Sequence, residues 1–161
     1  MTRGEGVGEG ALRRRCRRLL RELDVRPPLD VRDLCDRLAA RRGKPIRLVP
    51  YPIEIPGPFG LWFATDSADF IVYQQETTKP HQSHIILHEL GHMIAEHPSD
   101  DESTAFVARR TCYDSARERE AELIATIILE WASVLDTVHG GRQEASVDRL
   151  GDSLSHHHGW V

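Results

Sequence analysis

The spacing of hydrophobic residues predicts helices at both ends of the chain and short strands between them. Apolar residues recur every three or four positions at Leu12, Cys16, Leu19 or Leu20 and Leu23, which predicts an amphipathic helix over Ala11–Leu23 that stops before Pro27-Pro28. A second helix is expected to begin after Asp30, a good N-cap, and to end at Gly43, a residue type that often terminates helices. The N-terminal region therefore holds two short helices.

The middle of the chain has the composition of strands. Ile46–Val49 is expected to form a first strand, and the prolines from Pro50 to Pro58 are expected to form a stiff loop outside any sheet. Gly60–Ala64 and Phe70–Tyr73 predict a β-hairpin. Together these segments predict a short antiparallel sheet.

Two longer helices are predicted after the strands. A polar connection that includes Lys79-Pro80 should lead into a helix over about Gln82–His97. A helix over about Tyr113–Leu135 is apolar on nearly every face and should be central. After Gly140 the pattern predicts one weak helix in the C-terminal tail.

These elements predict an α+β fold, in which the short sheet packs on the two longer helices and the N-terminal helices precede it. A chain of 161 residues with 40% hydrophobic and 29% charged residues fits one globular domain. We expect a disordered leader over 1–10, a basic helical segment over 11–44, the core over 45–138 and a tail over 139–161.

Charge is distributed unevenly along the chain. Residues 1–44 carry a net charge of +6 and residues 45–161 a net charge of −10. The arginines between Arg13 and Arg21 could contact nucleic acid or a partner protein, but a leucine stripe runs through the same helix. We therefore favour a solvated arginine face, with the helix docked on the acidic body, over direct nucleic-acid binding.

Several features favour a cytoplasmic protein without a membrane span. The longest apolar run, Leu123–Leu129, is too short to cross a bilayer, and the first ten residues lack the apolar segment of a secretory signal. Cys16, Cys35 and Cys112 are widely spaced, which argues against a disulfide framework.

The segment His88-Glu89-Leu90-Gly91-His92 fits the H-E-x-x-H pattern of zinc-dependent hydrolases. On a helix, residues four apart lie about 6 Å apart along the axis on one face, so both imidazoles can hold one metal ion. Glu89 is then placed to take a proton from the attacking water. The alternative is a helix whose histidines merely cap or solvate it, but the apolar residues around the motif bury this helix.

A catalytic zinc ion needs a third protein ligand, which we expect from the long apolar helix. Glu118, Glu120 and Glu122 enter this helix, and unpaired buried carboxylates are costly. Glu118 and Glu122 share one face and Glu120 lies on the opposite face. Because both faces are apolar, periodicity alone cannot choose between them.

The two motifs together resemble the ImmA/IrrE family of metallopeptidases, which are gluzincins. The resemblance rests on H-E-x-x-H followed within about 30 residues by Glu118-x-x-Ala121-x-x-x-Ala125. It implies a zincin-like fold, Glu118 as the third ligand, and Glu122 as the acceptor for the far nitrogen of a zinc-bound histidine. The chain departs from the family pattern at Ile124, where an aromatic residue is usual, and lacks the Met-Pro end of the second motif.

Other polar residues are expected to play smaller parts. His84 lies too far along the axis to share one ion with His92, and His97 should interact with the helix dipole. The cluster His156–His158 could bind adventitious metal. Three side chains could stabilise an oxyanion, namely Tyr73, Tyr113 and His139, and the sequence does not favour one over the others.

The sequence therefore predicts a zinc endopeptidase with Zn²⁺ on His88, His92 and Glu118 and with Glu89 as the base. The hairpin could hold an extended substrate by β-augmentation. The family resemblance implies a specific partner, such as a repressor or antitoxin-like regulator. Two alternatives remain open: a non-catalytic metal-binding regulator that sequesters a transcription factor, and iron or manganese in place of zinc.

Overall fold

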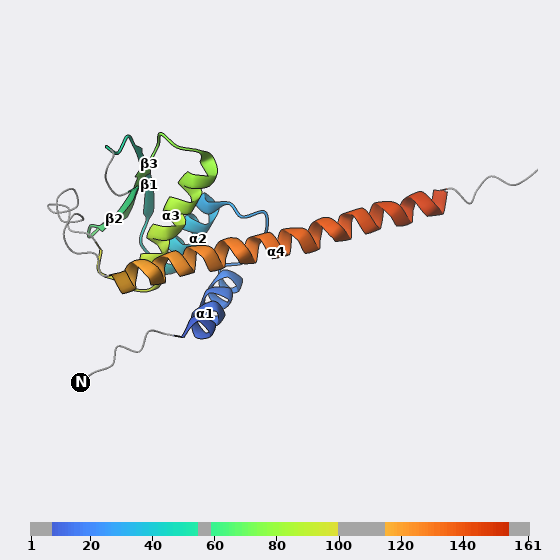
Figure 1. The fold of residues 1–161 in the computed structure, drawn as a ribbon, viewed down its shortest axis with the longest axis horizontal. Coiled ribbons are helices and arrows are strands. Elements are labelled where there is room, and N and C mark those ends of the chain that lie inside the picture. The colour runs from blue at the N-terminus through green and yellow to red at the C-terminus, as the bar shows by residue number, and fades with distance from the viewer. Residues whose placement is uncertain (1–7, 55–58, 100–114, 155–161) are drawn as a thin grey trace, which may run out of the picture.

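The computed structural model describes residues 8–54, 59–99 and 115–154, and the side chains of residues 139–154 are outside the description. Within this part of the chain, four helices and a three-stranded mixed sheet form a small α+β domain (Figure 1). The elements are α1 (Glu9–Glu22), α2 (Val31–Arg42), β1 (Ile46–Tyr51), β2 (Gly60–Ala64), β3 (Asp69–Gln74), α3 (Lys79–Ile94) and α4 (Ser115–Leu154). Among the described residues, no helix is both long and apolar enough to cross a membrane.

The two N-terminal helices follow the hydrophobic pattern closely. The Asp30 side chain caps α2 by accepting hydrogen bonds from the backbone amides of Arg32 (2.8 Å) and Asp33 (3.2 Å). Gly43, with a φ of 68°, ends this helix in the left-handed conformation. The prediction for α2 is confirmed at both ends.

The sheet differs from the antiparallel sheet expected. Its strand order is β1-β3-β2, with β3 parallel to β1 and antiparallel to β2. The hairpin of β2 and β3 is confirmed, but β1 lies on the far side of β3. β1 and β2 are therefore two strand spacings apart, about 10 Å, with β3 between them.

Pro50 lies within β1, although the prolines were expected to stay outside the sheet. The prediction for this residue was wrong because β1 is an edge strand in the order β1-β3-β2. An edge strand tolerates proline where the missing N–H would point away from its neighbour.

Helix α3 is displaced by three residues from the predicted helix. It begins after Thr78, which caps it, and Lys79-Pro80 lie in the first turn, where a proline costs no hydrogen bond. It ends at Ile94, and Glu96 then adopts a positive φ of 59°. His97 therefore follows the helix instead of belonging to its last turn.

Helix α4 is longer than predicted, because it continues without a break past Leu135 and through Gly140 to Leu154. Glycine in a helix costs about 1 kcal/mol relative to alanine, which weakens a helix without forbidding it. Figure 1 shows the C-terminal part of α4 extending beyond the rest of the molecule. The expectation that the helix is central holds for one face of residues 115–132, which buries Ala121, Ile124 and Ile128, whereas Leu129, Val134 and Val138 are exposed.

Three layers form the core. Helix α3 contacts both the sheet and α4, so it lies between them, and α1 packs on α4 (Figure 1). The α1 stripe of Leu12, Cys16 and Leu20 is buried. Arg13 on α1 pairs with Glu130 on α4 (2.6 Å), so one arginine of the basic segment contacts the acidic part of the chain.

Candidate metal centre

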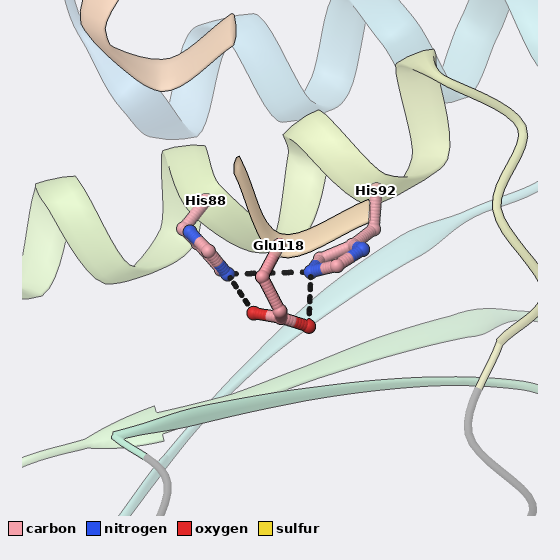
Figure 2. A group of neighbouring side chains, drawn as sticks. All are labelled: His88, His92 and Glu118. Carbon is pink, nitrogen blue, oxygen red and sulfur yellow. Dashed lines mark hydrogen bonds and ion pairs between the residues drawn. The ribbon is translucent and has the colours of Figure 1, made fainter. Parts of the chain in front are cut away.

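Three donor groups converge where α3 crosses α4. His88 Nε2 lies 3.1 Å from Glu118 Oε2, His92 Nε2 lies 3.2 Å from His88 Nε2, and His92 Nε2 lies 3.4 Å from Glu118 Oε1. Figure 2 shows the two imidazoles of α3 and the carboxylate of α4 pointing toward one another. The structure thus brings together the three residues that the sequence predicted as ligands, and they could hold a metal ion.

The spacing of these donors is compatible with a single bound ion. The two histidine nitrogens lie 3.2 Å apart, and each lies 3.1–3.4 Å from a different oxygen of Glu118. With one ligand atom taken from each residue, the three atoms lie within 4.8 Å of one another. A tetrahedral ion held by three protein donors would keep a fourth position for a further ligand.

Close contact between the helix backbones aligns the donors. A Cβ atom added to Gly91 would lie 2.6 Å from the Ala121 carbonyl oxygen and 2.9 Å from its Cα. Only glycine therefore fits at this crossing without displacing α4. Ala121 lies one turn after Glu118, so the contact sets the position of Glu118 opposite the two histidines.

The far nitrogen of His88 is held by a carboxylate. His88 Nδ1 lies 3.1 Å from Glu122 Oε2, and His84 Nε2 lies 3.0 Å from Glu122 Oε1. Loss of hydration raises the pKa of Glu122, but hydrogen bonds from His88 and His84 lower it by more, so its pKa lies below the usual value. An ionised Glu122 is suited to accept a hydrogen bond from Nδ1–H, which leaves Nε2 of His88 for a metal.

A second chain of contacts holds His92, and the sequence did not predict it. His92 Nδ1 lies 2.9 Å from His97 Nδ1, and His97 Nε2 lies 3.0 Å from Glu120 Oε2. Glu120, the alternative third ligand, therefore contacts His97 and is not a member of the donor group. The expected role of His97 at the helix dipole was wrong, because α3 ends before it and the following turn directs the ring back toward His92.

Glu89 is buried beside the donors, with 1% of its surface exposed. The start of β2 lies against it, since a Cβ atom added to Gly60 would be 2.8 Å from Glu89 Oε1 and 2.6 Å from Ile85 Cγ2. The missing side chain of Gly60 therefore lets the backbone of an edge strand approach the carboxylate.

The remaining candidate residues do not join this group in the described part of the chain. The Tyr73 hydroxyl accepts a hydrogen bond from Arg32 of α2 (3.1 Å), and its side chain is buried in the core. Tyr113, the cluster His156–His158 and the side chain of His139 lie outside the description.

The described cysteines take no part in the site. Cys16 and Cys35 are free and buried in the core. Burial raises the pKa of the Cys35 thiol to about 12, which keeps it protonated at neutral pH. Cys112 lies outside the described residues.

Comparison with family models, with curated proteins and with solved structures finds no significant match. What can be said of this protein's function therefore depends on the site itself. That site is a group of two histidines and one glutamate that could hold a metal ion within an α+β domain.

The contact with His97 predicts a measurable change in metal affinity. Replacing His97 with alanine removes the acceptor for His92 Nδ1 and is expected to weaken metal binding by about 10–100-fold. Competition with a chromophoric chelator measures this affinity. His81→Ala is the matched control, because His81 contacts Thr77 at the start of α3. Equal affinity in the His97 and His81 variants would show that His97 does not support the site.

Proposed function

We propose that this protein is a zinc-dependent endopeptidase that cuts a specific protein partner. The observation that carries the proposal is the buried Glu89 next to three converging metal donors. A purely structural metal site needs no carboxylate base beside it, whereas hydrolysis does. The alternative of a non-catalytic metal-binding regulator leaves the position of Glu89 unexplained.

The donor set favours zinc. Two imidazoles and one carboxylate also suit iron or manganese, which usually take more than four ligands. Three protein donors of these kinds, His88, His92 and Glu118, are typical of catalytic zinc, which keeps its fourth position for water.

A zinc ion bound there would polarise a peptide carbonyl and would make water a competent nucleophile near neutral pH. Glu89 accepts the proton of the attacking water and passes it to the leaving amine. Glu122 and His97 fix the rings of His88 and His92, so that each Nε2 stays directed at the site.

Within the described residues, the outer edge of β2 at Trp62 and Ala64 offers a binding site for an extended substrate. The Gln74 amide donates to the Phe59 carbonyl, and the Thr65 amide donates to the Ala68 carbonyl, both at 2.9 Å. Bonded and non-bonded pairs alternate along an antiparallel ladder. Trp62 and Ala64 therefore direct their backbone N–H and C=O groups away from β3, where a substrate strand can pair with them.

A proline at Ala64 tests this role of β2. Ala64→Pro removes one outward N–H without breaking the ladder to β3, and it is expected to lower kcat/KM by about tenfold with the metal retained. Ala64→Val, which keeps the N–H, is the matched control. Equal activity of the two variants in a cleavage assay would exclude substrate pairing at this position.

We infer the class of partner from the resemblance to the ImmA/IrrE family, which implies a repressor or antitoxin-like regulator. The test compares the protein N-termini formed in cells that express the wild-type chain or Glu89→Gln. Cleavage of a specific partner predicts a few new N-termini that require Glu89. A partner captured equally by both proteins, with no new N-terminus, would support the non-catalytic regulator instead.

A further inference from the structure

A second feature lies beside the metal centre. A cavity of about 610 Å³ is bounded by α1, α2, β2 and the C-terminal end of α3. This volume is within the range of small-ligand sites and exceeds that of a single side chain. Part of its wall is apolar, formed by Leu19, Leu38, Trp62, Met93 and Ile94.

The rest of the wall is mainly basic. Four arginines line the cavity, against two glutamates. Two of the arginines are neutralised within the fold: Arg41 pairs with Glu22, and Arg42 pairs with the fully buried Asp69 (2.9 Å). The other two, Arg15 and Arg18, belong to the basic face of α1.

Neither of these two arginines pairs with a carboxylate within the described residues. Arg15 donates to the backbone carbonyl of Ile94 (2.6 Å), which leaves its positive charge uncompensated. The Arg18 guanidinium has no hydrogen bond or ion pair in the described part of the chain. Glu96 also lines the cavity, and like Arg15 and Arg18 it is exposed, so solvent screens all three charges. The cavity therefore presents unneutralised cations beside an apolar wall.

The cavity adjoins the metal centre and β2 through two of its lining residues. His97 lines it and contacts the candidate ligand His92. Trp62 lines it from β2, two residues after Gly60, which lies against Glu89. Two residues of a strand span about 7 Å, so the cavity meets β2 about that far along the strand from the residue that contacts Glu89.

We propose that this cavity is a specificity subsite that binds an acidic side chain of the polypeptide substrate, held by Arg18 and Arg15. The proposal rests on the proposed function, because it assumes that the substrate lies along β2. Under this proposal the arginines of α1 bind the substrate and not nucleic acid. A glutamate or aspartate with apolar neighbours matches both the cations and the apolar wall.

Binding of short peptides to the full chain with zinc and the Glu89→Gln substitution tests the proposal without turnover. The probes are capped octapeptides carrying a neutral fluorophore, in which one glutamate moves along a sequence of alanine, leucine and glutamine. We expect glutamate at one position to strengthen binding about two- to fivefold over the all-glutamine peptide. Arg18→Gln should abolish this preference, whereas Arg17→Gln, the same change on an exposed part of α1, should preserve it.

Three results would overturn the subsite. These are no glutamate preference at any position, an equal loss in the Arg17 and Arg18 variants, and Arg18-dependent binding of inorganic phosphate in place of peptide. Cleavage by the wild-type chain separates this proposal from the proposed function. Cleavage without any glutamate preference would refute only the subsite, and Arg18-dependent binding without cleavage would refute only the peptidase.

Discussion

Glu89→Gln is expected to lower kcat/KM for peptide cleavage by about 10²–10⁴-fold while the protein keeps its metal. Glutamine has the shape of glutamate, so it preserves the packing of this buried residue against Gly60 and Ile85. It cannot accept the proton of the attacking water. The loss should therefore appear in kcat and leave the melting temperature and metal content nearly unchanged.

The matched control is Glu76→Gln, the same chemical change at an exposed position before α3. Cleavage rates on a partner identified in cells, with metal content determined on the same samples, measure both effects. Full activity of Glu89→Gln would contradict its assignment as the base. Loss of metal together with activity would mean that Glu89 supports the fold of the site and not the proton transfer alone.

Gly91→Ala is expected to lower the free energy of unfolding by about 2–3 kcal/mol. This is the upper end of the range usual for adding atoms to a well-packed core. The added methyl group would meet the Ala121 carbonyl at 2.6 Å, and backbone atoms of a packed helix cannot move aside as a flexible side chain can. Alanine is a better helix former than glycine by about 1 kcal/mol, which offsets only part of the clash. Separation of α3 from α4 should also weaken metal binding, because Glu118 would move away from His88 and His92.

Gly10→Ala is the control for the helix propensity of the substitution. Gly10 lies in α1, and its added Cβ would meet only the end of the Arg14 side chain at 3.5 Å, an ordinary contact. Urea denaturation should show Gly10→Ala equal to or more stable than the wild type. Equal stability of Gly91→Ala and the wild type would show that the helices are not in close contact at this crossing.

Local sequence signals predicted most helices and the hairpin because caps, periodicity and turn residues act over a few positions. Asp30 and Gly43 determine both ends of α2 in this way. The position of β1 beside β3 could not be predicted, because it depends on contacts between residues more than 20 positions apart. The prolines after β1 are visible in the sequence, but the strand order is not.

In the candidate site, too, features set by nearby residues were predicted and features set by distant contacts were not. The spacing of His88 and His92 on one helix face is a local property, and the structure retains it. The roles of Glu120 and His97 depend on how far α3 extends and on where α4 crosses it. A helix that ended at His97 would have placed this ring in the last turn, whereas the turn after Ile94 directs it to His92. The presence of three glutamates in an apolar helix was the signal that each needed a partner.

The metal content of the purified protein tests the central claim most directly. The protein would be prepared without a nickel column and with His156–His158 removed, as wild type and as His92→Ala, Glu118→Ala and Glu120→Ala. About one zinc per chain is expected in the wild type and in Glu120→Ala, and none in His92→Ala or Glu118→Ala. A wild-type protein that binds no zinc even after zinc is added back, or a site lost with Glu120 and retained without Glu118, would contradict the proposed centre.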